Sequence, residues 1–445
     1  MSVTNFALRI HNQNHSLDPY VRSLLDTDFY KLLMACFIWK NYSDVGVTFT
    51  LKNRSKTVTL PGLISESDLR DQLDYVKSLR FRKSELIWLQ GNTFYGQNGI
   101  FPPDFINALR DLQLPDYHLE KRDGEFHLSF TGTWLETTLW EIYGLSVLNE
   151  AKSRAAMREM SSYELTVLYA NATAKLVEKL KTLKSHDVRG IAEFGTRRRH
   201  GFLWQEFVIQ AMVEELGEGF LGTSNALHAM RMDLEAIGTN AHELPMTITA
   251  LERLRRPDDL SAQKYAQYKT LELWQNDFDG KLLVGLPDTF GTTQFLENAP
   301  DFVTQWTGFR EDSKDPFEGA EEKIQFWNSR GVDPRERLQL FSDGLDVDTM
   351  VSLNAAFKDR IRVGFGWGTN ATNDFRNCDP RGGHALDPIS LVCKVTHVKD
   401  FNTGQEIGAV KLSDNFLKAT GPDSEIAHYR QLFGQKGMHN IPVSV

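Results

Sequence analysis

The sequence is poor in the features that mark disulfide scaffolds, zinc sites and membrane proteins. Its three cysteines, Cys36, Cys378 and Cys393, form no CxxC pair, so neither a disulfide framework nor a structural zinc site is expected. No apolar run approaches the length of about 18 residues that a membrane helix needs, and MSVTNFALRIHNQNH has no apolar signal-peptide core. The net charge of -9 disfavours an extended nucleic-acid surface. We therefore expect a cytoplasmic enzyme with no nucleic-acid or membrane partner.

The pattern of strands and helices predicts two α/β units. Residues 1–145 contain a helix over 26–41, the strand VGVTFTLKN and a second strand before a helix in GEFHLSFTGTWLETTLWE. Over residues 146–384, strand candidates alternate with helical stretches: GIAEFGT, GFLGTSN, AIGTNAHE, LLVGLPDT, QWTGFREDS, LQLFSDG and IRVGFGWGT. Seven such units favour an irregular, TIM-like (β/α) barrel. SLVCKVTHVKD and IGAVKLSDN predict a hairpin through which residues 385–445 complete the N-terminal domain.

The most unusual motifs follow these strand candidates, where barrels carry their functional loops. In IRVGFGWGTNATND, Gly364, Gly366 and Gly368 allow close backbone approach. Thr369 and Asn370 add donors at a helix start, an arrangement that suits a phosphate. The alternative is a glycine-rich turn without a ligand. The sequence contains no GxxxxGK[ST], which disfavours a P-loop nucleotide enzyme.

Charged side chains follow other strands. In EFGTRRRHGF, three adjacent arginines cannot share one direction, so at most one or two face a site. The alternative is a solvated face, but Arg197 is placed to grip an oxyanion bidentately. Asp288, Asp312 and Asp343 lie in three acidic turns. Such carboxylates bind ribose hydroxyls, hold Mg²⁺ or stabilise a cationic transition state, and the alternative for each is helix N-capping.

GTNAHELPM places His242 beside Glu243, with no second metal ligand at suitable spacing. Three interpretations compete for this histidine: a buried core residue, a lone metal ligand, or a catalytic imidazole. The third rests on the small preceding residues, which leave access to the ring, and on the neighbouring carboxylate, which can orient it. Near the chain start, LLDTDFYKLLM offers Tyr30, which from the residues alone reads as a core aromatic.

Together, these motifs resemble the nicotinate phosphoribosyltransferase family of NAD salvage over nearly the whole chain. The resemblance rests on LLDTDFYK, FGTRRR, FLGTSN, GTNAHE, REDSKDP, FSDGLD, FGWGTNATND and GAVKLSDN, which occur in the family's order. It implies a type II phosphoribosyltransferase fold and a homodimer with shared active sites. It also implies an ATP-dependent ligase that forms nicotinate mononucleotide and diphosphate from nicotinate and 5-phosphoribosyl 1-diphosphate with Mg²⁺. ATP hydrolysis would be coupled through a phosphohistidine.

The resemblance assigns roles to residues of the reaction centre. His242 takes the phosphoryl group, and Glu243 is its neighbouring acid. Asp312 lies near the ribose and its Mg²⁺, and Asp288 is a further acid of the site. Phe194 and Tyr30 are implied to hold the pyridine ring between them. Further substrate-binding residues are Arg197, Arg310, Asp343, Thr223 and Ser224. They also fall on the phosphate cradle of Gly366, Gly368 and Thr369, and on Arg54, a pyrophosphate contact. Tyr30 and Arg54 are expected from the partner subunit.

Two positions bear on activity and specificity. The family usually has glycine where Lys314 stands, so Lys314 is expected either to alter its loop or to reach the phosphates. Ser224 occupies the position at which the related nicotinamide enzymes carry an acid. A hydroxyl there can donate to nicotinate, whereas an aspartate would repel it. The rival hypotheses are a catalytically inactive binding protein that senses phosphoribosyl diphosphate or a pyridine nucleotide, and a kinase-like ATPase.

Overall fold

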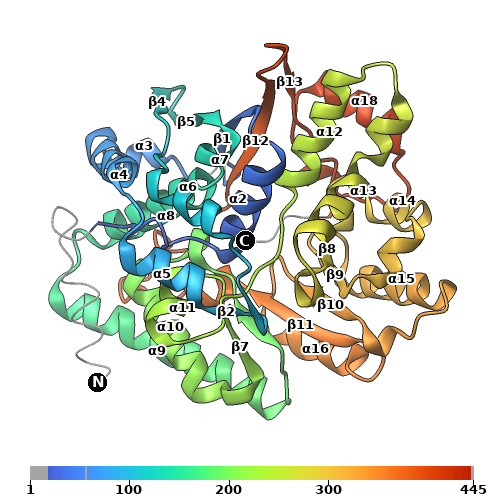
Figure 1. The fold of residues 1–445 in the computed structure, drawn as a ribbon. Helices are drawn as coiled ribbons and strands as arrows, with labels where there is room; N and C mark the ends of the chain where they lie inside the picture. The colour runs from blue at the N-terminus through green and yellow to red at the C-terminus, as the bar shows by residue number, and fades with distance from the viewer. Residues whose placement is uncertain (1–18, 56–57, 442–445) are drawn as a thin grey trace.

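The computed structural model describes residues 19–55 and 58–441 and contains two main sheets (Figure 1). The first is antiparallel, with the order β13-β12-β1-β5-β4. Its strands are β1 (Val45–Asn53), β4 (Tyr117–Arg122), β5 (Glu125–Thr133), β12 (Leu391–Asp400) and β13 (Glu406–Gly408). β12 pairs with β1 along its whole length, from Val45 opposite Asp400 to Asn53 opposite Leu391. The C-terminal hairpin therefore extends the N-terminal sheet, and its strands lie beside β1 in Figure 1.

Helix α2 (Phe29–Asn41) forms the centre of the N-terminal unit, where every residue from Phe29 to Ile38 is buried. The surrounding elements therefore enclose the helix on all sides. The N-cap position is Asp28, whose side chain does not cap the helix. Asp26, two residues earlier, is bound to Arg199.

Most of the remaining N-terminal helices pack around this centre. They are α3 (Leu60–Leu63), α4 (Glu66–Ser78), α5 (Lys83–Gly91), α6 (Pro103–Asp111) and α7 (Trp134–Thr137). A short hairpin joins β2 (Thr93–Phe94) to β3 (Gln97–Asn98). Helix α8 (Trp140–Met157) runs across the predicted boundary at residue 145 and is followed by α9 (Ser162–Ser185). The two units therefore share one continuous helix at the place where the sequence suggested a division.

The second sheet is parallel and six-stranded, with the order β7-β6-β11-β10-β9-β8. Its strands are β6 (Ile191–Glu193), β7 (Phe220–Thr223), β8 (Val284–Gly285), β9 (Gly308–Glu311), β10 (Leu338–Phe341) and β11 (Arg362–Trp367). Each lies within a segment that the sequence predicted as a strand. Helices such as α13 (Leu260–Asp277) and α15 (Pro316–Ser329) lie outside the sheet in Figure 1.

The sheet is not a closed barrel in the described part of the chain, because β7 and β8 remain its edges. The predicted seventh strand, AIGTNAHE, contributes one parallel bridge, between Ala236 and Thr223. Beyond that bridge Gly238 has φ +151°, and a Cβ there would lie 2.9 Å from the Tyr30 backbone nitrogen. The segment leaves the sheet because it passes directly against the start of α2. The parallel α/β sheet is therefore as expected, its strands form no closed barrel in the described residues, and the irregular TIM-like barrel stays a prediction.

The other helices of this half are α10 (Phe202–Leu216), α11 (Ala226–Met232), α12 (Glu243–Arg255), α14 (Thr292–Glu297), α16 (Val347–Phe357) and α17 (Thr369–Thr372). After β13 the chain crosses back to the parallel sheet, where Leu412 N donates to Thr289 O at 2.9 Å, before α18 (Asp423–Phe433). This crossing places the KLSDN segment at the carboxyl ends of β8 and β9. Within residues 19–55 and 58–441, no helix has both the length and the apolar character needed to cross a membrane.

Candidate active site

A cavity of about 500 Å³ lies inside the curve of the parallel sheet and reaches the carboxyl ends of its strands. A second cavity of about 100 Å³ adjoins it toward β12 and the C-terminal segment. Four residues line both: Arg197, Arg198, Asp312 and Asp343. The strand-end motifs predicted from the sequence therefore meet at one place, which consists of two connected compartments.

The larger cavity carries the two predicted aromatic residues. Phe194 and Tyr30 both line it, and Arg197 Nη1 donates to the Tyr30 hydroxyl at 2.6 Å. A Cβ on Gly366 would lie 2.4 Å from the Phe194 ring, so only glycine lets this ring lie against β11. Gly366 therefore makes room for Phe194 and also lines the cavity, and its phosphate-binding role stays a prediction. Gly368 and Thr369 line the cavity at the start of α17.

Tyr30 and Arg54 were expected from a partner subunit, but both belong to the compartments of their own chain. Tyr30 is bound to Arg197 of the same chain. Arg54 lines the smaller cavity, where Arg54 Nη2 lies 3.4 Å from Lys418 O. Within one chain, β1 and α2 already place both side chains beside the parallel sheet, and their supply by a partner subunit stays a prediction.

Ser224 lines the larger cavity and donates its hydroxyl to Asp28 Oδ1 at 2.7 Å. Asp28 also lines the cavity, and burial raises the pKa of its carboxyl. Sequence reasoning missed Asp28, because an aspartate just before a helix reads as an N-cap. Thr223 was predicted to bind substrate but lines neither compartment. Its hydroxyl donates to buried Glu193 at 2.5 Å, which corrects that prediction.

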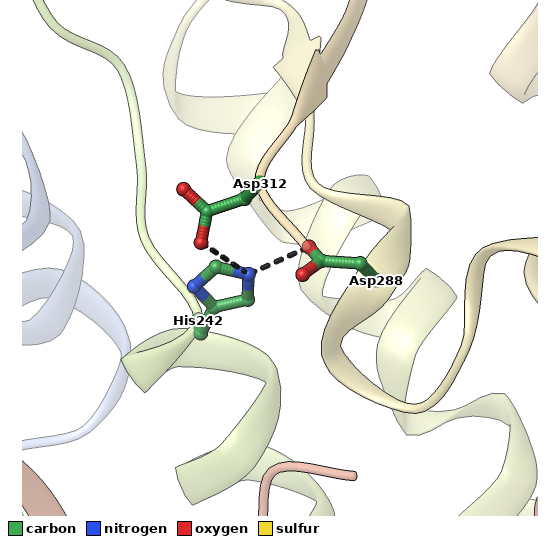
Figure 2. Close-up of side chains that lie close together, drawn as sticks. All are labelled: His242, Asp288 and Asp312. Carbon is green, nitrogen blue, oxygen red and sulfur yellow. Dashed lines mark hydrogen bonds and ion pairs between the residues drawn. The ribbon is translucent and has the colours of Figure 1, made fainter. Parts of the chain in front are cut away.

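His242 lines the smaller cavity immediately before α12. Its Nε2 lies 2.6 Å from Asp288 Oδ1 and 3.7 Å from Asp312 Oδ2 (Figure 2). Burial lowers the pKa of His242 to about 4, against the opposing effect of Asp288, so the imidazole is neutral at physiological pH. The pKa of Asp288 is also depressed, chiefly by His242 and Lys411 acting against its burial.

The proton of this neutral imidazole has a defined place. An ionised Asp288 can only accept, so Nε2 carries the hydrogen and Nδ1 holds a lone pair. Figure 2 shows Nδ1 on the side of the ring opposite Asp288. No residue of the described ranges hydrogen-bonds to Nδ1, since the bonds of His242 all involve Nε2 or the backbone. The Nδ1 lone pair is therefore available to a ligand in the cavity.

The acid that orients the ring is Asp288, not Glu243. The Glu243 side chain accepts from Trp134 Nε1 at 2.6 Å and Thr138 Oγ1 at 2.7 Å, and it forms a buried ion pair with Lys31. Consecutive side chains at a helix start point in different directions, so adjacency in sequence did not bring Glu243 to the imidazole. The predicted catalytic role of Glu243 is corrected to a structural one.

Lys411 neutralises the acids around His242. Its ammonium lies 3.1 Å from Asp288 Oδ2 and 3.5 Å from Asp312 Oδ2, and Ser313 Oγ donates to Asp288 at 2.7 Å. His242, Asp288 and Asp312 lie close enough to share one metal ion. However, an ammonium already bridges the carboxylates, and Mg²⁺ prefers an all-oxygen shell. These three residues do not fit the Mg²⁺ that the family implies.

The smaller cavity is rich in cations. Besides Arg54 and Arg197, to which the sequence analysis gave roles, it is lined by Arg198, Lys394, Lys411 and Lys418, to which it gave none. The three lysines come from the C-terminal segment, and the motif GAVKLSDN was the available signal for Lys411. Such a cluster favours a polyanionic ligand.

Two of the three adjacent arginines face the cavities, in line with the expectation that at most one or two would do so. Arg197 and Arg198 line both cavities. Arg199 is fully buried, and its Nη1 lies 2.7 Å from Asp26 Oδ1.

The other predicted residues lie at the junction or outside it. Asp343 has φ +72° and pairs with Lys418. Arg310 lines the larger cavity, with its Nε 4.0 Å from Asp312 Oδ1. Lys314 does not reach either cavity. Its ammonium lies 2.6 Å from Glu322 and 3.1 Å from the Thr293 hydroxyl, so the replacement of glycine places no cation at the phosphates.

Comparison with known proteins agrees with this geometry. A model of the nicotinate phosphoribosyltransferase (NAPRTase) family matches residues 190–437, and a model of the NAPRTase N-terminal domain matches residues 25–149. The fold is similar to that of nicotinate phosphoribosyltransferase from Porphyromonas gingivalis, with a TM-score of 0.80 and 26% identity over 93% of this chain and 100% of that one. It is also similar to the Vibrio cholerae enzyme, with a TM-score of 0.81 and 28% identity over 95% of this chain and 96% of that one.

Proposed function

The chain belongs to the nicotinate phosphoribosyltransferase family, and we propose that it couples transfer of a phosphoribosyl group onto nicotinate to ATP hydrolysis through a phosphorylated His242. The products are nicotinate mononucleotide and diphosphate. One arrangement carries the coupling: His242 lines a cation-rich cavity that adjoins the aromatic one, and Asp288 holds its Nε2 so that no described residue binds its Nδ1.

The two compartments match the two halves of the reaction. The aromatic cavity suits the pyridine ring of nicotinate between Phe194 and Tyr30, with Arg197 as the counter-charge for its carboxylate. Asp312 and Asp343, at the junction, lie where the ribose would bridge the compartments. During displacement at the anomeric carbon, their carboxylates would stabilise the positive charge that develops on the ribose ring. The cations of the smaller cavity would hold the departing diphosphate.

Phosphoryl transfer uses the same smaller cavity. Nδ1 attacks the γ-phosphorus of ATP, the nitrogen–phosphorus bond forms, and the bond to the ADP oxygen breaks. Asp288 accepts the Nε2 hydrogen throughout and stabilises the imidazolium character of the phosphorylated ring. Water then hydrolyses the phosphohistidine. Mg²⁺ would enter with the substrate phosphates and neutralise their charge, and the carboxylate oxygens of Asp312 and Asp343 are the acidic groups common to both compartments.

The quaternary structure is a separate proposal. The family resemblance implies a homodimer, but α2 and β1 of one chain already supply Tyr30 and Arg54 to its own cavities. We therefore expect one chain to contain the complete set of substrate-binding residues named above. Light scattering across a concentration series, read together with specific activity, tests this expectation. Specific activity that stays constant across a dimer-to-monomer transition is the expected result.

The decisive experiment follows labelled nicotinate with 5-phosphoribosyl 1-diphosphate and Mg²⁺, with and without ATP. Wild type should form the mononucleotide and be stimulated by ATP, whereas His242→Asn should lose the stimulation. Binding of both substrates without product would favour the sensor hypothesis. ADP formation that ignores nicotinate would favour the kinase-like ATPase.

A further inference from the structure

Asp28 and Ser224 form a buried pair at the nicotinate end of the larger cavity. Both line the cavity and both are 2% exposed. The backbone fixes them together, since Phe29 N donates to Ser224 O at 2.6 Å and Ala226 N donates to Thr27 O at 2.9 Å. The contact between the Ser224 hydroxyl and Asp28 Oδ1, at 2.7 Å, is therefore built into the fold.

This contact limits what Ser224 can offer a substrate. A serine hydroxyl has one hydrogen, and an ionised Asp28 receives it. In that state Ser224 presents only lone pairs to the cavity. Lone pairs accept a hydrogen bond from a carboxamide NH₂ but repel a carboxylate. If Asp28 is protonated, its own O–H can donate to Ser224 Oγ, and the serine hydrogen becomes free to bind a carboxylate.

We propose that Asp28 sets the choice between pyridine acid and pyridine amide: nicotinate binds to the protonated Asp28–Ser224 pair, and nicotinamide binds to the ionised pair. This inference rests on the proposed function. Where Asp28 is ionised in the free protein, binding of nicotinate is accompanied by uptake of one proton onto an Asp28 carboxyl oxygen, and no bond within the substrate changes. Asp28 is thus a specificity-determining residue. Its charge decides whether Ser224 can donate its hydroxyl hydrogen to the substrate.

The charges around Asp28 favour its protonation when nicotinate binds. From the loop after β6, Arg197 Nη1 lies 3.7 Å from Asp28 Oδ2, and the same nitrogen donates to the Tyr30 hydroxyl of α2. Glu141 of α8 and Glu193 of β6 add negative potential. A nicotinate carboxylate that takes the Arg197 guanidinium removes the main counter-charge of Asp28. The proton affinity of Asp28 then rises as the acid substrate enters.

The test is the pH dependence of selectivity. The kcat/KM for nicotinate is compared with the inhibition constant of nicotinamide, as a competitor of nicotinate, from about pH 6 to about pH 9. The selectivity ratio is kcat/KM for nicotinate divided by the reciprocal of the inhibition constant of nicotinamide. In this ratio, pH effects on binding that both ligands share cancel. Wild-type preference for nicotinate should fall as pH rises, approaching about tenfold per pH unit where Asp28 is ionised. Asp28→Asn should show a flat ratio, because its amide cannot change charge.

Glu193→Gln is the matched control. Glu193 is also a buried carboxyl of raised pKa, but it does not line the cavity or contact the Ser224 hydroxyl. This variant should retain the wild-type slope. If Asp28→Asn does not fold, calorimetric titration of wild type with nicotinate in buffers of different ionisation enthalpy gives the second readout. Uptake of up to one proton is expected.

A flat wild-type ratio, a slope that persists in Asp28→Asn, or nicotinate binding without proton uptake at any pH would overturn the inference. Each of these outcomes leaves mononucleotide synthesis intact and so leaves the proposed function standing. Absence of mononucleotide at every pH would overturn the proposed function, and the inference with it.

Discussion

Replacing Asp288 by asparagine should abolish most phosphorylation of His242 while leaving the fold intact. The side chain is buried and accepts the Nε2–H of His242 at 2.6 Å and the Ser313 hydroxyl at 2.7 Å. Asparagine has nearly the same shape and keeps one carbonyl oxygen. It loses the charge and can present its NH₂ group to Nε2 instead. In that case the ring hydrogen moves to Nδ1, the nitrogen that must attack.

The size of the effect follows from the bond that is lost. A buried hydrogen bond to a charged acceptor contributes about 1.5–3 kcal/mol, which corresponds to roughly 10- to 150-fold in rate. If the ring also changes tautomer, the loss approaches the roughly 10⁴-fold seen when a triad aspartate becomes asparagine. We therefore expect phosphorylation to slow by about 10² to 10⁴. Loss of charge opposite Lys411 should lower the free energy of unfolding by about 1–3 kcal/mol.

The assay measures transfer of label from γ-labelled ATP to the protein, together with ATP-independent mononucleotide formation and the Tm. Glu243→Gln is the control, because Glu243 adjoins His242 in sequence but faces Lys31. It should lower the Tm by a few degrees and still phosphorylate at close to the wild-type rate. Phosphorylation of a folded Asp288→Asn within about threefold of wild type would refute this account of the imidazole.

Three further changes test other parts of the structure. Gly366→Ala should push the Phe194 ring into the cavity, because the added Cβ would lie 2.4 Å from it, and should raise the KM for nicotinate by about tenfold or more in steady-state assays. Lys314→Met should leave kcat/KM within about twofold and lower the Tm, since Lys314 ties its loop to Glu322 and not to substrate; loss of activity in a folded variant would contradict this. Glu193 has its pKa raised to about 7 by burial, so the stability of the wild type should fall as pH rises from about 4.5 to about 7. The free energy of unfolding of Glu193→Gln, measured with denaturant, should therefore rise by about 3 kcal/mol relative to that of wild type over that pH range. A difference between the two proteins that does not change with pH would show that Glu193 titrates normally.

The sequence by itself determined the elements and which ends of them carry chemistry. Hydrophobic runs that end in polar or glycine turns identified β6 to β11, because a buried parallel strand is apolar throughout and its functional residues follow its carboxyl end. Asp288, Asp312 and Asp343 could be grouped on that ground from the sequence alone, whereas the role of Phe194 came from the family resemblance. The strand-like segments on either side of the turn FNTGQE likewise predicted a hairpin, which the structure contains as β12 and β13.

Local patterns were less able to fix element boundaries and closure. The segment AIGTNAHE has the composition of a strand, yet Gly238 turns it against α2 and the sheet stays open between β7 and β8. Packing against a distant element thus outweighed the local preference of this segment. Helix α8 runs through residue 145, and the division into two domains there stays a prediction.

Only the tertiary structure decided which side chains meet. Sequence adjacency favoured Glu243 as the acid of His242, but the contact belongs to Asp288, 46 residues away. Ser224 meets Asp28 across 196 residues, and Lys411 reaches the site because the C-terminal segment recrosses the molecule. The physical reason is that periodicity sets the face and the end of an element on which a residue lies. The direction of each polar side chain depends on the charges and donors that distant segments bring beside it.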